Sequence, residues 1–323
     1  MGKGFIGSAV AVALIALALV AVRDSGRSSS CRQQALGPLL ASWQTVGGCG
    51  AGASSGTGAG VKWIGRNVTG GLVHVEMQGN YIKTTYGYNY VGTSLVTRDV
   101  TEKWNLGVAV PYLYKYMHHY AGLAFNVANQ GIGDIDFLLT RRLGAINDYI
   151  LTLSVGAPTG TYRAHLLRTD REIIPQDRQL GAGKVTGSLM LDHVIDNIWG
   201  PTVIGGLASW RGGENSEHNY RAPNATLYAY SSYLLGPFAP ALGLQVTGAT
   251  THDRDQAMGD QATALFSVAA NASLEWSTDW IAVLVGASLP YQYDALTKDN
   301  MDRPHYWSFG AWIVGLGIAV SPF

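Results

Sequence analysis

Residues 105–116 read NLGVAVPYLYKY, and their alternation predicts the fold. One face of this stretch would carry the fatty and aromatic side chains Leu106, Val108, Val110, Tyr112, Tyr114 and Tyr116. The other face would carry Asn105, Gly107, Ala109 and Lys115, with Leu113 as an exception. Period-two alternation is typical of a β-strand, because successive side chains point to opposite faces. We expect the fatty face to contact lipid.

The same alternation recurs from about residue 70 onward. In residues 281–293, large apolar and aromatic side chains alternate with Ala282, Leu284, Gly286 and Ser288. In residues 312–320, Trp312 and branched apolar residues alternate with a face rich in glycine and alanine. This pattern predicts strands with lipid on one side and a compact or polar interior on the other.

The connections between these stretches alternate between short and long. Short turns are expected near residues 101–103, 144–148, 196–197, 236–237 and 277–279. Long polar loops are expected at residues 121–131, 164–181, 212–224, 253–260 and 295–305. Bacterial outer-membrane barrels have this combination of periplasmic turns and extracellular loops, and an even strand number. We therefore predict an all-β, transmembrane antiparallel β-barrel of about 12 strands, with both ends in the periplasm.

The placement of aromatic residues agrees with a barrel. Trp104, Trp199, Trp276 and Trp280 lie next to predicted short turns, where an inner aromatic girdle belongs. A second set is expected nearer the outer rim, and it consists of Tyr112, Tyr114, Tyr116, Trp210, Tyr228, Tyr230, Tyr291 and Tyr293. The alternative is a soluble β-sandwich, which does not explain the alternation of long and short connections.

Composition excludes several other classes. Of the 323 residues, 47% are hydrophobic and 14% are charged, whereas about 25% of residues are charged in typical soluble domains. The mean hydropathy of +0.08 is nevertheless far too low for a bundle of membrane helices. The formal net charge is +0, so the chain lacks the basic excess that nucleic-acid binding requires.

The N-terminal part differs from the rest. Residues 1–22 read as a signal peptide, with Lys3 before an apolar run that is shorter than the ~20 residues of a membrane-spanning helix, the alternative interpretation. Residues 23–69 are a Gly/Ser-rich segment, expected to be a periplasmic linker or a plug for the barrel of residues 70–323. Cys31 and Cys49 can form a disulfide in an oxidising periplasm, and two free thiols are the alternative.

Three stretches resemble one bacterial family when taken together. They are DVTEKWNLGVAVPY at 99–112, GIGDID at 131–136, and VGAPTGTY at 155–162 followed by GAGK at 181–184. Their order and spacing are similar to those of the outer-membrane transporter family labelled meta-pathway of phenol degradation. The resemblance implies a barrel that admits small hydrophobic or aromatic molecules. The final Phe323 is similar to the C-terminal aromatic residue that the barrel insertion machinery recognises in many such proteins.

Charged and polar side chains are predicted on the inner face, where an aqueous or internally paired environment tolerates them. On the lipid face Arg or Lys would cost ~2–4 kcal/mol near the bilayer midplane. The predicted pore-lining residues are His74, Glu76, Lys115, Asp134, Asp136, Arg142, Lys184, Asp192 and Glu275. They would select solutes by charge and width. The alternative is internal salt bridging, in which Asp134 and Asp136 pair with Arg142 or Lys184.

Signals for catalysis and metal binding are weak, and no cofactor is expected. The GxSxG match at residues 52–56 lies in a low-complexity segment without the strand and helix that a nucleophile elbow needs. His118 and His119 would point to opposite faces of a strand, so they cannot easily share a metal.

We therefore predict a monomeric or weakly oligomeric channel in the outer membrane, in contact with its lipid, for passive uptake of small hydrophobic or aromatic solutes. The rivals are a lipase-type barrel hydrolase, with Ser209 and His218 as the nearest candidates, and a structural or adhesin barrel.

Overall fold

The computed structural model describes residues 73–84, 87–101, 103–117, 126–144, 149–164, 179–210, 212–249, 264–278, 281–294, 306–308 and 311–320. The regular secondary structure in this part of the chain is all β, and none of it is a helix long and apolar enough to span a membrane. The predictions for residues 1–22, for residues 23–69 with Cys31 and Cys49, for His118 and His119, for Trp280 and for Phe323 lie outside the described residues.

The strands are long and follow one another along the chain. They are β1 (Val73–Thr84), β2 (Gly87–Asp99), β3 (Trp104–Met117), β4 (Val127–Ile132), β5 (Ile135–Leu143), β6 (Tyr149–Ala157), β7 (Thr186–Asn197), β8 (Gly200–Trp210), β9 (Asn224–Ser232), β10 (Phe238–Ala249), β11 (Ala264–Ser277), β12 (Ile281–Asp294), β13 (Tyr306–Ser308) and β14 (Ala311–Val320).

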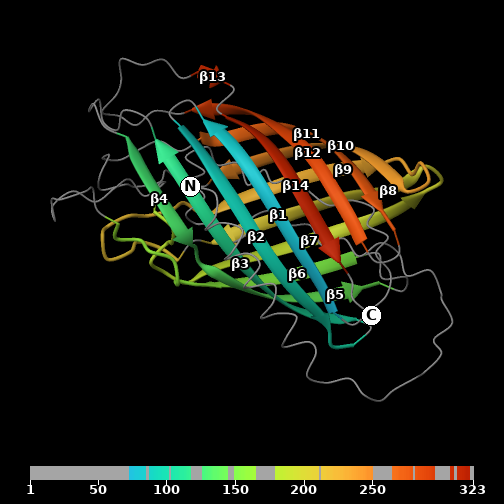
Figure 1. Ribbon diagram of the computed structural model, residues 1–323, viewed down its shortest axis with the longest axis horizontal. Coiled ribbons are helices and arrows are strands. Elements are labelled where there is room, and N and C mark those ends of the chain that lie inside the picture. Colours follow the sequence, from blue (N-terminus) through green and yellow to red (C-terminus); the bar gives the residue numbers. More distant parts are fainter. Residues whose placement is uncertain are drawn as a thin grey trace.

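Antiparallel pairing closes the sheet into a barrel (Figure 1). Twelve strands pair in the order β1-β2-β3-β5-β6-β7-β8-β9-β10-β11-β12-β14, and β14 pairs with β1, which closes these twelve strands into a ring. The sheet has 14 strands, of which β4 pairs only with β3 and β13 only with β12. Leaving out these two gives twelve strands around the ring, which confirms the predicted fold class. Closure satisfies backbone hydrogen bonds that lipid cannot satisfy.

Each of the two strands outside the ring is in line with a ring strand. β4 and β5 pair with successive parts of β3, and β13 and β14 pair with successive parts of β12. β3 pairs first with β5, from Trp104↔Arg141 to Ala109↔Asp136, and then with β4, from Tyr112↔Ile132 to Met117↔Val127. Between β4 and β5 lie Gly133 and Asp134, so one wall position is interrupted there. The loop expected at residues 121–131 is correspondingly shorter than predicted, because β4 occupies its last part.

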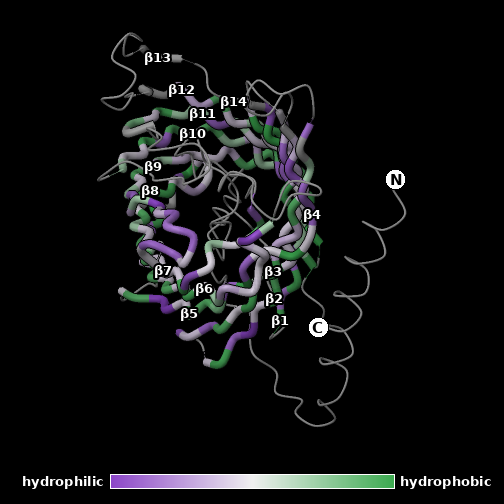
Figure 2. Tube along the Cα trace, turned by 90° about the vertical axis from the view of Figure 1, so that its left-hand side faces the viewer, coloured by the Kyte–Doolittle hydropathy of each residue, from purple (hydrophilic) through white to green (hydrophobic). Residues whose placement is uncertain are grey.

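The two faces of the wall differ as the alternation predicts. On β14, Trp312, Val314, Leu316 and Ile318 are exposed on the outside, whereas Ile313 and Ala319 are buried on the inside. Viewed along the barrel, hydrophobic and hydrophilic residues alternate around the ring (Figure 2). The apolar outer face is the surface that an acyl-chain environment would cover.

From β2 onward the connections also alternate as predicted. The turns after β2, β5, β7, β9 and β11 are short, whereas the connections after β3, β6, β8, β10 and β12 are longer. Trp104 begins β3, Trp199 lies in the turn before β8 and Trp276 is near the end of β11, so these three tryptophans mark the end of the barrel with short turns.

The other end carries an aromatic cluster of Tyr81, Tyr88, Tyr90, Tyr114, Tyr116 and Trp312. The centroids of neighbouring rings in this cluster are 4.9–6.1 Å apart. The rim prediction was wrong for two tyrosines. Tyr228 and Tyr230 are 3% and 4% exposed, and they share the inner face of β9 with Thr226 and Ser232. The polar character of Thr226 and Ser232 was the sequence signal for this orientation.

Candidate functional site

The inner face of the barrel holds most of the residues predicted to line it. Seven of the nine are buried there, namely His74, Glu76, Lys115, Asp134, Asp136, Asp192 and Glu275. Arg142 is half-buried, and Lys184 is exposed just before β7. The nine residues do not form one cluster, because they are distributed around the ring and along its length.

A charged group lies inside the end with short turns. Asp99 accepts a hydrogen bond from the Asn105 side-chain amide at 3.0 Å. His74 Nε2 and Arg142 Nη2 each lie 3.8 Å from a carboxylate oxygen of Asp99. Sequence reasoning missed Asp99, because it is the last residue of β2 and its face depends on where the turn begins.

The proposed pairing of Arg142 with Asp136 is excluded by distance along β5. Both residues lie on the inner face of this strand, six positions apart, which corresponds to about 20 Å at ~3.4 Å per residue. The side chains therefore lie at different depths in the barrel, and Asp99 is the carboxylate that approaches Arg142.

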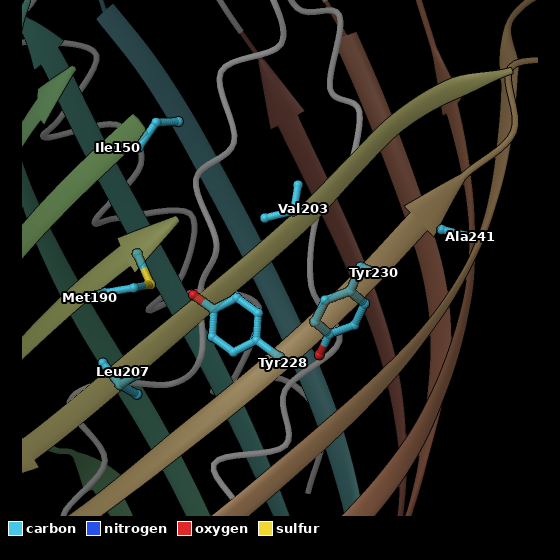
Figure 3. Close-up of a cluster of buried hydrophobic side chains, with 7 residues drawn as sticks. All are labelled: Ile150, Met190, Val203, Leu207, Tyr228, Tyr230 and Ala241. Carbon is cyan, nitrogen blue, oxygen red and sulfur yellow. The ribbon is translucent and has the colours of Figure 1, made fainter. Parts of the chain in front are cut away.

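An apolar patch interrupts the polar interior. We call it the inner apolar patch, and it consists of Ile150, Met190, Val203, Leu207, Tyr228, Tyr230 and Ala241 (Figure 3). These residues come from the five consecutive strands β6 to β10 and are all buried. The patch is therefore a continuous, buried apolar region on one side of the interior.

Glycines make room for both tyrosine rings of this patch. A Cβ atom at Gly205 would lie 2.5 Å from Tyr228 Cε2, and one at Gly243 would lie 2.1 Å from Tyr230 Cδ1. Each ring thus lies against the backbone of a neighbouring strand. The Tyr228 hydroxyl donates a hydrogen bond to Asp192, and the Tyr230 hydroxyl donates one of 3.4 Å to Gln245 Oε1. The two rings are consequently packed against backbone, with their hydroxyl groups held by fixed polar side chains.

Part of the connection between β6 and β7 lies inside the barrel. We call its two described legs, residues 158–164 and 179–185, the inner strap. Leu180 packs against Val91 and Leu113, which are on the inner faces of β2 and β3. The Lys115 ammonium donates a hydrogen bond of 2.5 Å to the backbone oxygen of Gln179. These contacts place the strap against the inner faces of β2 and β3, which are separated from its own strand β6 by β5.

Asp134 holds the two legs of the inner strap together. Its Oδ1 accepts a hydrogen bond of 2.9 Å from the Gly160 amide, and its Oδ2 accepts one of 2.7 Å from the Ala182 amide. The hydroxyl of Thr159 donates to the Gly133 carbonyl at 3.0 Å and accepts from the Ile135 amide at 3.0 Å. The interruption between β4 and β5 is therefore the anchor point of the strap.

The strap also contacts the loop between β8 and β9. Asn215 donates its side-chain amide to the Ala182 carbonyl at 3.0 Å, and Arg163 Nε lies 2.6 Å from Glu217 Oε1. The legs bond to each other as well, because the amides of Leu180 and Gly181 both donate to the Thr161 carbonyl.

The stretches quoted for the family resemblance meet at this place. Pro111 of the first accepts a hydrogen bond from Gly133 of the second, and Asp134 binds Gly160 and Ala182 of the third. A structural requirement thus accounts for residues that also form the family signature.

The described residues contain no group of three or more His, Cys, Asp or Glu side chains arranged to hold a metal ion. His218 Nδ1 lies 2.6 Å from Glu214 Oε1, and no hydrogen bond in the described part of the chain joins Ser209 to His218.

No protein-family profile matches this chain, and no curated protein matches it. The family resemblance therefore gains no support from those two comparisons. Solved structures similar to this chain include the NanC porin, with 8% identity, a TM-score of 0.45 and coverage of 77% of this chain and 100% of that one.

Two further structures are similar at the same level. A FadL homologue of Pseudomonas aeruginosa has 10% identity, a TM-score of 0.41 and coverage of 77% and 89%. The transport unit of the autotransporter AIDA-I from Escherichia coli has 12% identity, a TM-score of 0.45 and coverage of 80% and 92%. The barrel fold described above follows from the strand pairing of this chain and not from these likenesses.

Proposed function

We propose that this chain is an outer-membrane channel for the passive uptake of small hydrophobic or aromatic solutes. Twelve of the described strands close into a ring, and its outer face carries large exposed apolar residues. Both properties suit a lipid environment. The described inner face carries most of the buried polar residues, which suits a path for solutes.

The inner apolar patch is the observation that supports hydrophobic or aromatic solutes as the transported class. An aromatic solute that crosses from water to this surface would bury apolar area at about 25 cal/mol per Å² on each side of the contact. Two tyrosine rings of the patch lie 5.8 Å apart and are tilted by 57°. They are 3% and 4% exposed, so a third ring would contact them by replacing the groups that now cover them. Conduction requires that the solute is released again, and contact with a single patch keeps the binding of the solute weak enough for this.

The charged residues refine this solute class. Among the described residues, the buried carboxylates Glu76, Asp134, Asp136, Asp192 and Glu275 outnumber the buried basic side chains Lys115, Arg221 and His74. Carboxylates around a narrow path repel anions. We therefore propose neutral aromatic solutes in preference to aromatic carboxylates.

Liposome swelling tests the proposal with solutes that do not cross the bilayer unaided. The full-length protein is reconstituted and given a neutral aryl glycoside, an acidic aryl glycoside and a disaccharide of similar mass. The expected order of swelling rates is neutral aryl glycoside, then disaccharide, then acidic aryl glycoside. A fatty-acid uptake assay and a variant without residues 24–60 extend the comparison to long apolar solutes and to the N-terminal segment.

Two results contradict the proposal. Equal rates for all solutes would leave a general porin without preference for aromatic groups. The absence of both swelling and single-channel conductance in planar bilayers would favour a structural or adhesin barrel.

A further inference from the structure

We infer that the inner strap is a fixed constriction that determines the size limit for solutes, with Asp134 as its positioning residue. The inference rests on the proposed channel function, because a constriction has an effect only on a solute path. Its basis is the set of contacts that hold the strap inside the ring, and these contacts come from β2 and β3, from Asp134 between β4 and β5, and from the loop between β8 and β9.

The first attachment is to β2 and β3. Leu180 is 4% exposed and fills the space over Val91 and Leu113, so the tip of the second leg is packed into the wall. The adjacent Gln179 receives the hydrogen bond from Lys115, whose side chain is fully buried. Moving this leg outward would expose apolar surface and remove a bond to a buried ammonium group, which is costly.

The second attachment is the Asp134 carboxylate. It is buried, and each oxygen accepts a hydrogen bond from a different leg. Charge-assisted bonds to backbone amides are stronger than neutral ones. If the legs separated, at least one amide would lose this partner. Asp134 therefore sets the distance between the legs, and acts on solutes only through the strap.

The close approach of the legs depends on glycine. A Cβ atom at Gly160 would lie 2.7 Å from the Leu180 carbonyl oxygen, and one at Gly181 would lie 2.4 Å from the Gly160 carbonyl oxygen. The backbones of the two legs are in direct contact here, so a larger residue at either glycine would collide with backbone atoms. This arrangement favours a fixed element over a swinging gate.

The third attachment is to the loop after β8. Asn215 is buried and holds the Ala182 carbonyl, while Glu217 pairs with Arg163. The strap is thereby tied on its outer side to another connection at the same end of the barrel. An outward movement of the strap would have to break this attachment together with the other two.

The test compares Asp134→Ala and Asp134→Asn with the unchanged protein in liposome swelling, using sugars of increasing size. Asp134→Ala removes both acceptors, so the rates for the larger sugars should rise several-fold and the size limit should move upward. Asp134→Asn keeps one acceptor oxygen, so its swelling rates should lie between those of Asp134→Ala and those of the unchanged protein. Glu214→Gln is the control, because it removes a carboxylate from the same end of the barrel that bonds His218.

A second measurement does not depend on permeation. Hydrogen exchange followed by mass spectrometry should show faster exchange in strap peptides of Asp134→Ala, with unchanged exchange in β11 and β12. Migration of unheated samples in detergent gels reports whether each variant is folded. If Asp134→Ala does not fold, Thr159→Val removes the neighbouring anchor and takes its place in both assays.

The outcomes separate the two proposals. An unchanged size limit together with unchanged strap exchange in folded Asp134→Ala would overturn the constriction. A lack of permeation by the unchanged protein would overturn the channel, whereas the exchange result would still report on the attachment by Asp134.

Discussion

The Tyr228 hydroxyl donates a hydrogen bond to the Asp192 carboxylate across an intervening strand. The two residues are on β9 and β7, and Gly205 of β8 is the register partner of both. A Cβ atom at Gly205 would lie 2.2 Å from Asp192 Oδ1 and 2.5 Å from Tyr228 Cε2. The bond therefore exists because β8 has no side chain at this point, and it fixes the orientation of one ring of the inner apolar patch.

Gly205→Ala should consequently destabilise the barrel. The added methyl group would push the Tyr228 ring away from Asp192, and the loss of a hydrogen bond to a buried acceptor costs ~1–3 kcal/mol. The free energy of unfolding by urea in lipid vesicles measures the effect. Gly206→Ala is the matched control, because its nearest neighbour is the flexible end of Leu227 at 3.2 Å. Equal losses in the two variants would show that the contact is not important.

Tyr228→Phe and Tyr228→Ala should separate the hydroxyl from the ring. Phe retains the apolar face, so the variant should keep the preference for neutral aryl glycosides while losing stability through Asp192. Ala removes the face as well, so the ratio of aryl glycoside to disaccharide swelling rates should fall toward one. The same ratio in Tyr228→Phe and Tyr228→Ala would mean that the ring does not contact solutes.

The wall of the barrel was predictable from sequence, because it depends on a local rule. Leu106 and Val108 lie outside and Ala109 and Lys115 inside, as period two requires. The rule also holds on β9, but the prediction for Tyr228 and Tyr230 was wrong because the general tendency of aromatic residues to form rim belts was preferred to it. The space for their rings comes from Gly205 and Gly243 in the neighbouring strands, and this space is a long-range feature that the pattern of β9 does not report.

The site was less predictable than the wall. Lys115 and Asp134 are buried inside the ring, and their partners are the backbones of Gln179, Gly160 and Ala182. Sequence reasoning considered charge pairs, since side-chain types are visible in a sequence. Hydrogen bonds to backbone groups of a loop that folds back inside the ring are long-range contacts and leave no periodic signal.

Lys115→Met should change the charge preference of the channel. The substitution keeps a long side chain in the wall but removes the ammonium group among the buried carboxylates. The interior then carries a more negative charge, so the channel should become more selective for cations. The reversal potential in a potassium chloride gradient measures this shift. Lys83→Met, on the outer face of β1, removes the same charge outside and should leave the reversal potential unchanged. A shift of equal size in both variants would contradict the inward role of Lys115.

Leu244→Arg should test the lipid contact of the outer face. Leu244 is 61% exposed and lies at the middle of β10, whereas Phe238 is 45% exposed and begins that strand beside a short turn. Arginine facing lipid costs ~2–4 kcal/mol near the midplane and ~0–1 kcal/mol near an interface. Leu244→Arg should therefore lower the free energy of unfolding in lipid vesicles much more than Phe238→Arg. The two variants present the same charge on the same face of one strand, so only depth in the bilayer distinguishes them. Equal stability of the two, or a folded protein that stays dissolved without detergent, would mean that water rather than lipid covers this surface.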